Sequence, residues 1–187
     1  MVDLNHITTL PPAEADKTET KKELKKLRKE LFKLQNKFYA DGRYSMLIVL
    51  QGLDTSGKDG TIRHAFIGMN PQGVQVTSFK KPSADELKHD FLWRIYPHFP
   101  EKGKIRVFNR SYYEDVLVPS VNKSLSGDEL VPNQWDDFRD AYDTLLNACD
   151  HLPWHIIPAD KRWFRNYTAA KILAEQLEKL NLDYPNK

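Results

Sequence analysis

The fold class is decided by the run Met46-Leu-Ile-Val-Leu50 and by Gly52-Leu-Asp-Thr-Ser-Gly-Lys58, which follows one residue later. The first run is apolar throughout and of strand length, so it predicts a central parallel strand covered on both faces. The second has the GxxxxGK spacing of a loop whose backbone N–H groups surround phosphate oxygens while its lysine neutralises their charge. Apolar residues then recur at helical spacing, at Ile62, Ala65, Phe66 and Met69. We therefore expect a strand, a phosphate-binding loop and a helix in succession.

Strand and helix patterns alternate along the rest of the chain. Strands are expected at 46–50, 74–79, 105–108 and 154–157, and helices at 20–38, 62–69, 83–97, 135–149 and 172–180. Capping boxes predict two of the helix starts, at Thr20 with Glu23 and at Ser83 with Glu86. Because strands alternate with helices, we expect an α/β fold with a mainly parallel central sheet.

Length and composition indicate one ordinary domain. The 187 residues carry 28 basic and 26 acidic side chains, a balance that does not indicate a nucleic-acid binder. No run approaches the roughly 18 apolar residues that span a membrane, and no signal peptide is evident, so we expect a cytoplasmic protein without a membrane partner. Residues 1–19 contain Pro11-Pro12 and lack periodicity, which predicts an arm lying on the surface or on another subunit, ahead of a domain at 20–187.

Two acidic residues in and after the loop are unusual. Asp59 occupies the position after Lys58, where such loops carry the Ser or Thr that binds Mg²⁺, so carboxylates have to supply the metal ligands. Asp54 lies inside the loop, where a negative charge suits metal binding or proton acceptance from the incoming nucleophile. The alternative for Asp54 is an Asx-turn with a purely structural role.

The third expected strand ends in Asn109-Arg-Ser-Tyr-Tyr-Glu-Asp115, which places an arginine and two carboxylates at the carboxyl edge of the sheet. Ligands bind at this edge in α/β folds, and the loop lies there too. Arg110 can spread its donors over phosphoryl oxygens, and Asp115 can hold Mg²⁺ directly or through water. A surface ion pair is the alternative.

Three segments resemble the signatures of the family-2 polyphosphate kinases: Gly52 to Gly60, Phe108-Asn-Arg-Ser-Tyr-Tyr-Glu-Asp-Val-Leu117 and Pro158-Ala-Asp-Lys-Arg-Trp-Phe-Arg-Asn166. The resemblance covers roughly residues 20–120 and 134–184. It implies a P-loop kinase-like three-layer fold and phosphoryl transfer between inorganic polyphosphate and a nucleotide, with AMP and ADP favoured. It also implies Mg²⁺ as cofactor, with Mn²⁺ as a substitute, and assembly into a homo-oligomer.

The resemblance assigns roles to individual residues. The catalytic set it implies is Asp54, Lys58, Arg110 and Asp115, with Asp54 and Asp115 as the metal ligands. Phosphate binding falls to the loop and the start of its helix, namely Gly52, Thr55, Ser56, Gly57, Lys58, Asp59, Gly60 and Thr61. Weaker nucleotide-binding candidates are Asn109, Glu114, Arg94 and Lys161.

The chain departs from the family near residues 126–134. Family members carry further residues there, which form a helix, a fourth core strand and a basic helical lid, whereas this chain has only a short connection. An engineered excision, a natural deletion and a join across absent residues all fit this pattern. A real loss would remove charge stabilisation and water exclusion, which predicts slow transfer or hydrolysis. Two other functions stay open: an ATP-dependent nucleoside monophosphate kinase, and a catalytically weak polyphosphate-binding protein.

Overall fold

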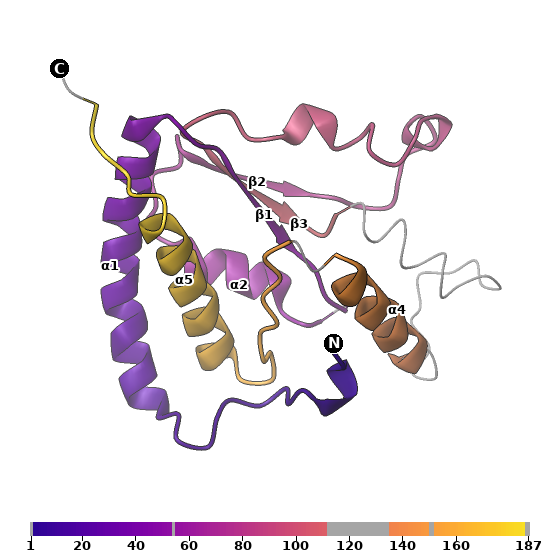
Figure 1. Ribbon diagram of the computed structural model, residues 1–187, viewed down its shortest axis with the longest axis horizontal. Coiled ribbons are helices and arrows are strands. Elements are labelled where there is room, and N and C mark those ends of the chain that lie inside the picture. Colours follow the sequence, from indigo (N-terminus) through magenta and orange to yellow (C-terminus); the bar gives the residue numbers. More distant parts are fainter. Residues whose placement is uncertain (1, 54, 112–134, 150–151, 186–187) are drawn as a thin grey trace.

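The computed structural model describes residues 2–53, 55–111, 135–149 and 152–185, and its elements are arranged around one sheet (Figure 1). The strands are β1 (Met46–Leu50), β2 (Val74–Ser78) and β3 (Ile105–Asn109). The α-helices are α1 (Lys17–Asp41), α2 (Lys58–Ala65), α4 (Trp135–Ala148) and α5 (Arg162–Glu178), with 3₁₀ turns η1 (Leu4–His6), η2 (Glu86–Lys88) and η3 (Tyr96–His98). No described helix has both the length and the apolar character needed to cross a membrane.

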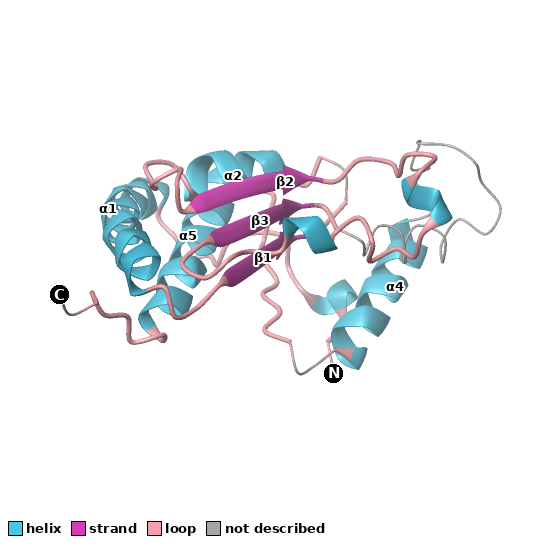
Figure 2. Cartoon of the chain, turned by 90° about the horizontal axis from the view of Figure 1, so that it is seen from above, coloured by secondary structure: helices cyan, strands magenta, loops and turns pink. Residues whose placement is uncertain are grey.

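The described sheet is parallel, with the strand order β1-β3-β2 (Figure 2). This confirms the parallel α/β fold and the first three strands. The central position was assigned wrongly, however, because β3 rather than β1 lies in the middle of the described sheet. Ile105, Val107 and Phe108 of β3 are fully buried, whereas all of β1 is half-buried, as befits a strand with one described neighbour.

The two faces of β3 are covered by different material, which gives three layers. Ile105 and Val107 point to the face where α1, α2 and α5 supply an apolar cluster, with α1 and α5 packed against each other along their length (Figure 1). Phe108 points to the opposite face because side chains alternate along a strand, and it contacts Phe79 and Ile95. The second face is thus closed by the irregular segment 79–99.

Helix α1 begins at Lys17, ahead of the predicted capping box. Its N-cap is Asp16, whose Oδ1 accepts a hydrogen bond from the Glu19 backbone N–H at 2.7 Å. Thr20, the predicted cap, is buried inside the helix and donates its hydroxyl hydrogen to the Asp16 carbonyl oxygen at 2.6 Å. The capping box at Thr20 was therefore wrong, because Asp16 satisfies the free N–H groups one turn earlier.

The helix expected at 83–97 is replaced by the 3₁₀ turns η2 and η3. The Ser83 and Glu86 box does form, with Glu86 Oε2 accepting from the Ser83 N–H at 2.7 Å and Ser83 Oγ accepting from the Glu86 N–H at 3.2 Å. The chain then leaves the helical path at Asp90, whose Oδ1 accepts from the Leu92 N–H at 2.9 Å. A short acidic side chain that bonds nearby backbone competes with helix formation, and here it ends the helix.

The strand expected at 154–157 does not form within the described chain. The Trp154 N–H donates locally to the Leu152 carbonyl at 2.8 Å, and the indole Nε1 donates to the Cys149 carbonyl at 3.2 Å. These local bonds hold Trp154 near the end of α4, and the chain then continues toward α5 without pairing with the described strands. Helix α5 also starts at Arg162, about three turns before the expected residue 172.

The N-terminal arm lies against α4 of the same chain (Figure 1). Asn147 bonds Val2 twice, accepting from its N–H at 2.7 Å and donating to its carbonyl at 2.9 Å. Asp143 Oδ1 accepts from the Leu4 N–H at 2.9 Å. The start of the arm thus lies on the surface of its own chain, and contact of the arm with another subunit stays a prediction.

We expect Leu31→Ala to lower the free energy of unfolding by about 2–5 kcal/mol, because the side chain is almost fully buried between α1 and α5 and its truncation leaves a cavity. Urea unfolding followed by circular dichroism measures the change. Lys33→Ala, at an exposed position on the same helix, is the control and should change stability by less than about 0.5 kcal/mol. Equal losses in the two variants would contradict the packing described above.

Candidate phosphate-binding site

The loop between β1 and α2 has the backbone conformation that an anion site requires. Gly57 is the N-cap of α2 and has a left-handed φ of 92°, a conformation that costs glycine little. Glycine has no side chain with which to cap a helix, so Gly57 itself makes no cap hydrogen bond to the N–H groups of the first turn. These groups and the helix dipole favour phosphate. Asp54, the predicted loop carboxylate, lies outside the described residues.

Lys58 folds back over the loop that it follows. Its Nζ donates to the Gly52 carbonyl at 2.6 Å and to the Leu53 carbonyl at 3.0 Å. The ammonium group is therefore held against the backbone of the phosphate-binding loop, as the motif predicted. Because it is half-buried, its attraction to a phosphate is screened less than at an open surface.

Oxygen-bearing side chains gather where β2, β3 and α2 meet. Asn109, the last residue of β3, donates from Nδ2 to Asp59 Oδ1 at 2.5 Å and to Ser78 Oγ at 3.4 Å. A carboxylate, a hydroxyl and an amide are the hard donors that Mg²⁺ prefers. The chemistry of this set thus fits a divalent metal, although Asp115, the second predicted ligand, and Glu114 lie outside the described residues.

The chain turns sharply as it leaves β3. Arg110 has a left-handed φ of 64°, which costs a residue with a Cβ about 1–2 kcal/mol. Its backbone N–H donates to the Leu50 carbonyl at 3.1 Å, so the ends of β3 and β1 are tied together. The structure therefore places Arg110 beside the entrance to the phosphate-binding loop, at a strained position of the kind that clusters at functional sites.

Behind this turn a polar chain reaches α4. Ser111, nearly fully buried, donates from Oγ to Gln51 Oε1 at 3.4 Å, and Gln51 Nε2 donates to the Tyr142 hydroxyl at 3.0 Å. Helix α4 is thus connected to both the start of the loop and the end of β3.

The two threonines among the predicted phosphate-binding residues differ in exposure and in hydrogen bonding. Thr55 is exposed and has a left-handed φ of 65°. Thr61 is buried and donates its hydroxyl hydrogen back to the Gly57 carbonyl at 3.2 Å, which stabilises the first turn of α2. The Thr61 hydroxyl is therefore bound to the helix itself, whereas Thr55 faces solvent.

Arg94 is occupied by contacts within its own segment. Its Nη2 donates to the Lys80 carbonyl at 2.7 Å, its Nε lies 3.3 Å from Glu86 Oε1, and its guanidinium lies over the Phe79 ring at 5.3 Å. These contacts hold the two ends of the irregular segment together. Its prediction as a nucleotide-binding residue stays a prediction.

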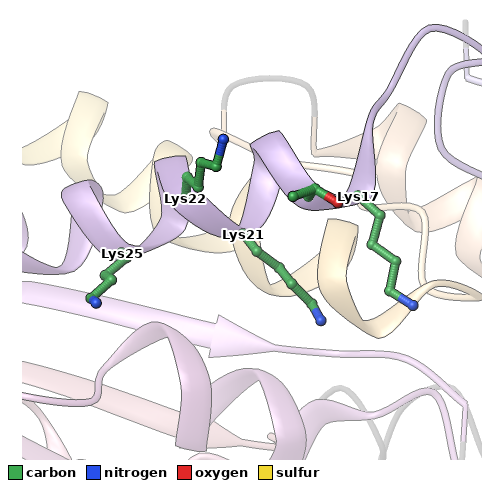
Figure 3. Close-up of a pocket in the computed structure, with 5 residues that line it drawn as sticks. Lys17, Lys21, Lys22 and Lys25 are labelled. Carbon is green, nitrogen blue, oxygen red and sulfur yellow. The ribbon is translucent and has the colours of Figure 1, made fainter.

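Lys161, another nucleotide-binding candidate, is the N-cap of α5 and lines a basic groove between α1 and α5. The groove also contains Asp160 and several cations, including Lys17, Lys21, Lys25, Arg28 and Arg162. Lys17, Lys21 and Lys25 extend to one side of α1 and Lys22 extends away from them, so the helix presents lysines around its exposed surface (Figure 3). A solvated helical face is the interpretation that the sequence favoured for these lysines.

One site residue, Arg165, was not singled out in the sequence. It lies on α5, is only 8% exposed, and donates from Nη1 to the Ser56 carbonyl at 3.2 Å. Burial lowers the pKa of its guanidinium, with repulsion from Arg162 as a smaller cause. The sequence signal that could have indicated this contact is the pair of glycines at 57 and 60, because glycine often marks a place where another group packs closely against the backbone.

Comparisons with known proteins agree with this geometry. The family model described as polyphosphate kinase 2 (PPK2) matches residues 14–131 and 123–185. The chain is 34% identical to the AMP/ADP-polyphosphate phosphotransferase of Meiothermus ruber, with 85% of this chain and 81% of the relative aligned. It is 33% identical to the ADP-polyphosphate phosphotransferase of Rhodopseudomonas palustris, with 81% of this chain and 77% of the relative aligned.

Solved structures show the same similarity. The polyphosphate kinase 2 of Arthrobacter aurescens superimposes with a TM-score of 0.89 at 28% identity, covering 100% of this chain and 88% of the other. The alignment with the Meiothermus ruber relative extends over 217 positions, more than the 187 residues of this chain. That relative therefore contains internal residues without a counterpart here, and their location near 126–134 stays a prediction.

Replacing the loop lysine should weaken phosphate binding without unfolding the protein. We expect Lys58→Ala to raise the Kd for tripolyphosphate about 10- to 100-fold, since a hydrogen bond to a charged group contributes about 1.5–3 kcal/mol. Isothermal titration calorimetry measures the change. Lys102→Ala removes the same charge at an exposed position ahead of β3, at the opposite edge of the sheet, and should leave the Kd unchanged. Equal weakening by both substitutions would mean that only net charge matters.

Proposed function

Because the chain belongs to the polyphosphate kinase 2 family, we propose that it transfers a phosphoryl group between inorganic polyphosphate and a nucleoside mono- or diphosphate, with AMP and ADP favoured. The observation that carries the proposal is the glycine-capped helix start at Gly57 beside Lys58, with Asp59 and Asn109 joined at the neighbouring strand end. Phosphoryl transfer needs chiefly positioning and charge stabilisation, and this arrangement can supply both.

The chain's residues divide this work by position. The loop from Gly52 to Gly60 binds the phosphate chain through its N–H groups, and Lys58 balances the charge of the terminal groups. Arg110, at the end of β3, stabilises the negative charge on the phosphoryl group as it moves. Asp54 accepts a proton from the incoming nucleophile or binds the metal, in keeping with its place inside the loop.

Magnesium fits the oxygen donors of the site. We propose that Asp54 and Asp115 are its ligands and that Asp59 and Asn109 support them, with Mn²⁺ as a substitute. The ion would neutralise charge on neighbouring phosphate oxygens. Nucleotide binding is assigned to Asn109, Glu114, Arg94 and Lys161. Arg94 also holds segment 79–99 in shape.

We further propose a cytoplasmic homo-oligomer. Large apolar side chains are exposed along the irregular segment, among them Leu87 at 70% and Tyr96 at 61%. Clusters of exposed apolar groups are typical of interaction surfaces. Light scattering on the wild type and on a Leu87→Ser, Tyr96→Ser variant tests this, and an unchanged mass would contradict the assigned surface.

The deciding experiment measures ADP and ATP formed from AMP and polyphosphate, with Mg²⁺ and with EDTA. We expect metal-dependent product that is lost in Asp54→Asn and in Lys58→Ala, because each removes a group assigned to the reacting phosphates. Lys102→Ala should retain wild-type activity. Inorganic phosphate is measured in parallel, since a real loss of the lid residues predicts hydrolysis.

Other outcomes would select the other two functions. Product formed from ATP but not from polyphosphate would indicate a nucleoside monophosphate kinase. Tripolyphosphate binding by a folded sample that forms no product would indicate a binding protein.

A further inference from the structure

We propose that Arg165 is a positioning residue of the phosphate-binding loop: its guanidinium fixes the backbone from Ser56 to Gly60, and the bound phosphate chain compensates its charge. The second half of this inference rests on the proposed function. It adds a residue on α5, distant in sequence, to a site otherwise built from the loop and the strand ends.

The contact with Ser56 sets the direction of the loop's N–H groups. Arg165 Nη1 donates to the Ser56 carbonyl at 3.2 Å. In a planar trans peptide the C=O and the following N–H point in opposite directions. Holding the Ser56 oxygen therefore also fixes the Gly57 N–H, at the residue that caps α2.

The two glycines leave the space that the guanidinium fills. A Cβ at Gly57 would lie 1.8 Å from Arg165 Nη1, and a Cβ at Gly60 would lie 2.7 Å from Nη2. Gly57 is also required for its left-handed φ, but Gly60 is an ordinary helical residue at which alanine would favour the helix. Glycine at position 60 is thus explained by the close approach of the Arg165 guanidinium, which leaves no room for a Cβ.

Among the residues that the structure describes, no acidic side chain forms an ion pair with Arg165. Its Nη2 donates to the Asn166 side-chain oxygen at 3.2 Å, and its Nε has no hydrogen-bond partner. The influences on its pKa are burial and Arg162, both of which disfavour the charged form. A buried charge without a counterion is costly, so an anion bound at the adjacent loop would gain from it.

A double-mutant cycle between positions 60 and 165 tests the contact. We expect Gly60→Ala alone to lower the unfolding temperature and to raise the Kd for tripolyphosphate at least about tenfold, because the new methyl group displaces the guanidinium. In the Arg165→Met background the same substitution should leave both quantities unchanged or raise the unfolding temperature. Additive effects in the cycle would overturn the proposal.

A charge series tests the compensation. We expect Arg165→Met to raise the Kd for tripolyphosphate at least about tenfold and Arg165→Lys to recover most of that loss, since lysine keeps the positive charge that attracts the phosphate chain. Hydrogen exchange without ligand should be faster at residues 56–60 in Arg165→Met, and kinetics should show a raised KM for polyphosphate. Wild-type binding and exchange in Arg165→Met would overturn the inference.

The controls separate this inference from the proposed function. A wild-type chain that neither binds tripolyphosphate nor forms product contradicts the function. A wild-type chain that does both, beside an Arg165→Met variant that behaves identically, contradicts the inference alone. If Arg165→Met is too unstable to assay, the Gly60→Ala and Arg165→Lys variants are compared with the wild type. A Kd for tripolyphosphate at least about tenfold higher in Gly60→Ala supports the inference, and wild-type binding by Gly60→Ala overturns it.

Discussion

The left-handed turn at Gly57, where the chain passes from β1 into α2, is the constraint on which the rest of the structure depends. It leaves the first N–H groups of the helix without a described side-chain cap and directs them to the carboxyl edge of the sheet. Because the strands are parallel, the ends of β1, β2 and β3 all reach this edge. Asn109, Arg110 and Ser78, at the ends of β3 and β2, therefore lie at the same edge as the loop.

Cationic side chains hold the loop by its carbonyl groups. Lys58 donates to the Gly52 and Leu53 oxygens, and Arg165 donates to the Ser56 oxygen. Arg165 can do so only because α5 packs along α1, where buried residues such as Leu31 and Leu177 fix the distance between the helices. The apolar core and the electrostatics of the site are thus parts of one arrangement.

The irregular segment 79–99 shows how local and tertiary preferences compete. Its capping box forms as the sequence predicted, yet Asp90 bonds the backbone two residues on and the helix stops. Ile95 and Phe79 then pack on Phe108, while Leu87 stays exposed. Helical spacing of apolar residues was misleading here, because burial on the sheet selected a different set.

The sequence by itself determined the parallel α/β fold, the strand, loop and helix around Lys58, and the placement of Arg110 at a strand end. These are local patterns, since apolar runs, glycine spacing and the motif depend on neighbouring residues. Only the tertiary structure decided that β3 is the central described strand, that 154–157 does not join the described sheet, and that Arg165 reaches the loop. Those features depend on contacts between residues distant in the chain. The spacing of apolar residues predicts which face of an element is buried, but not which other element will pack on it.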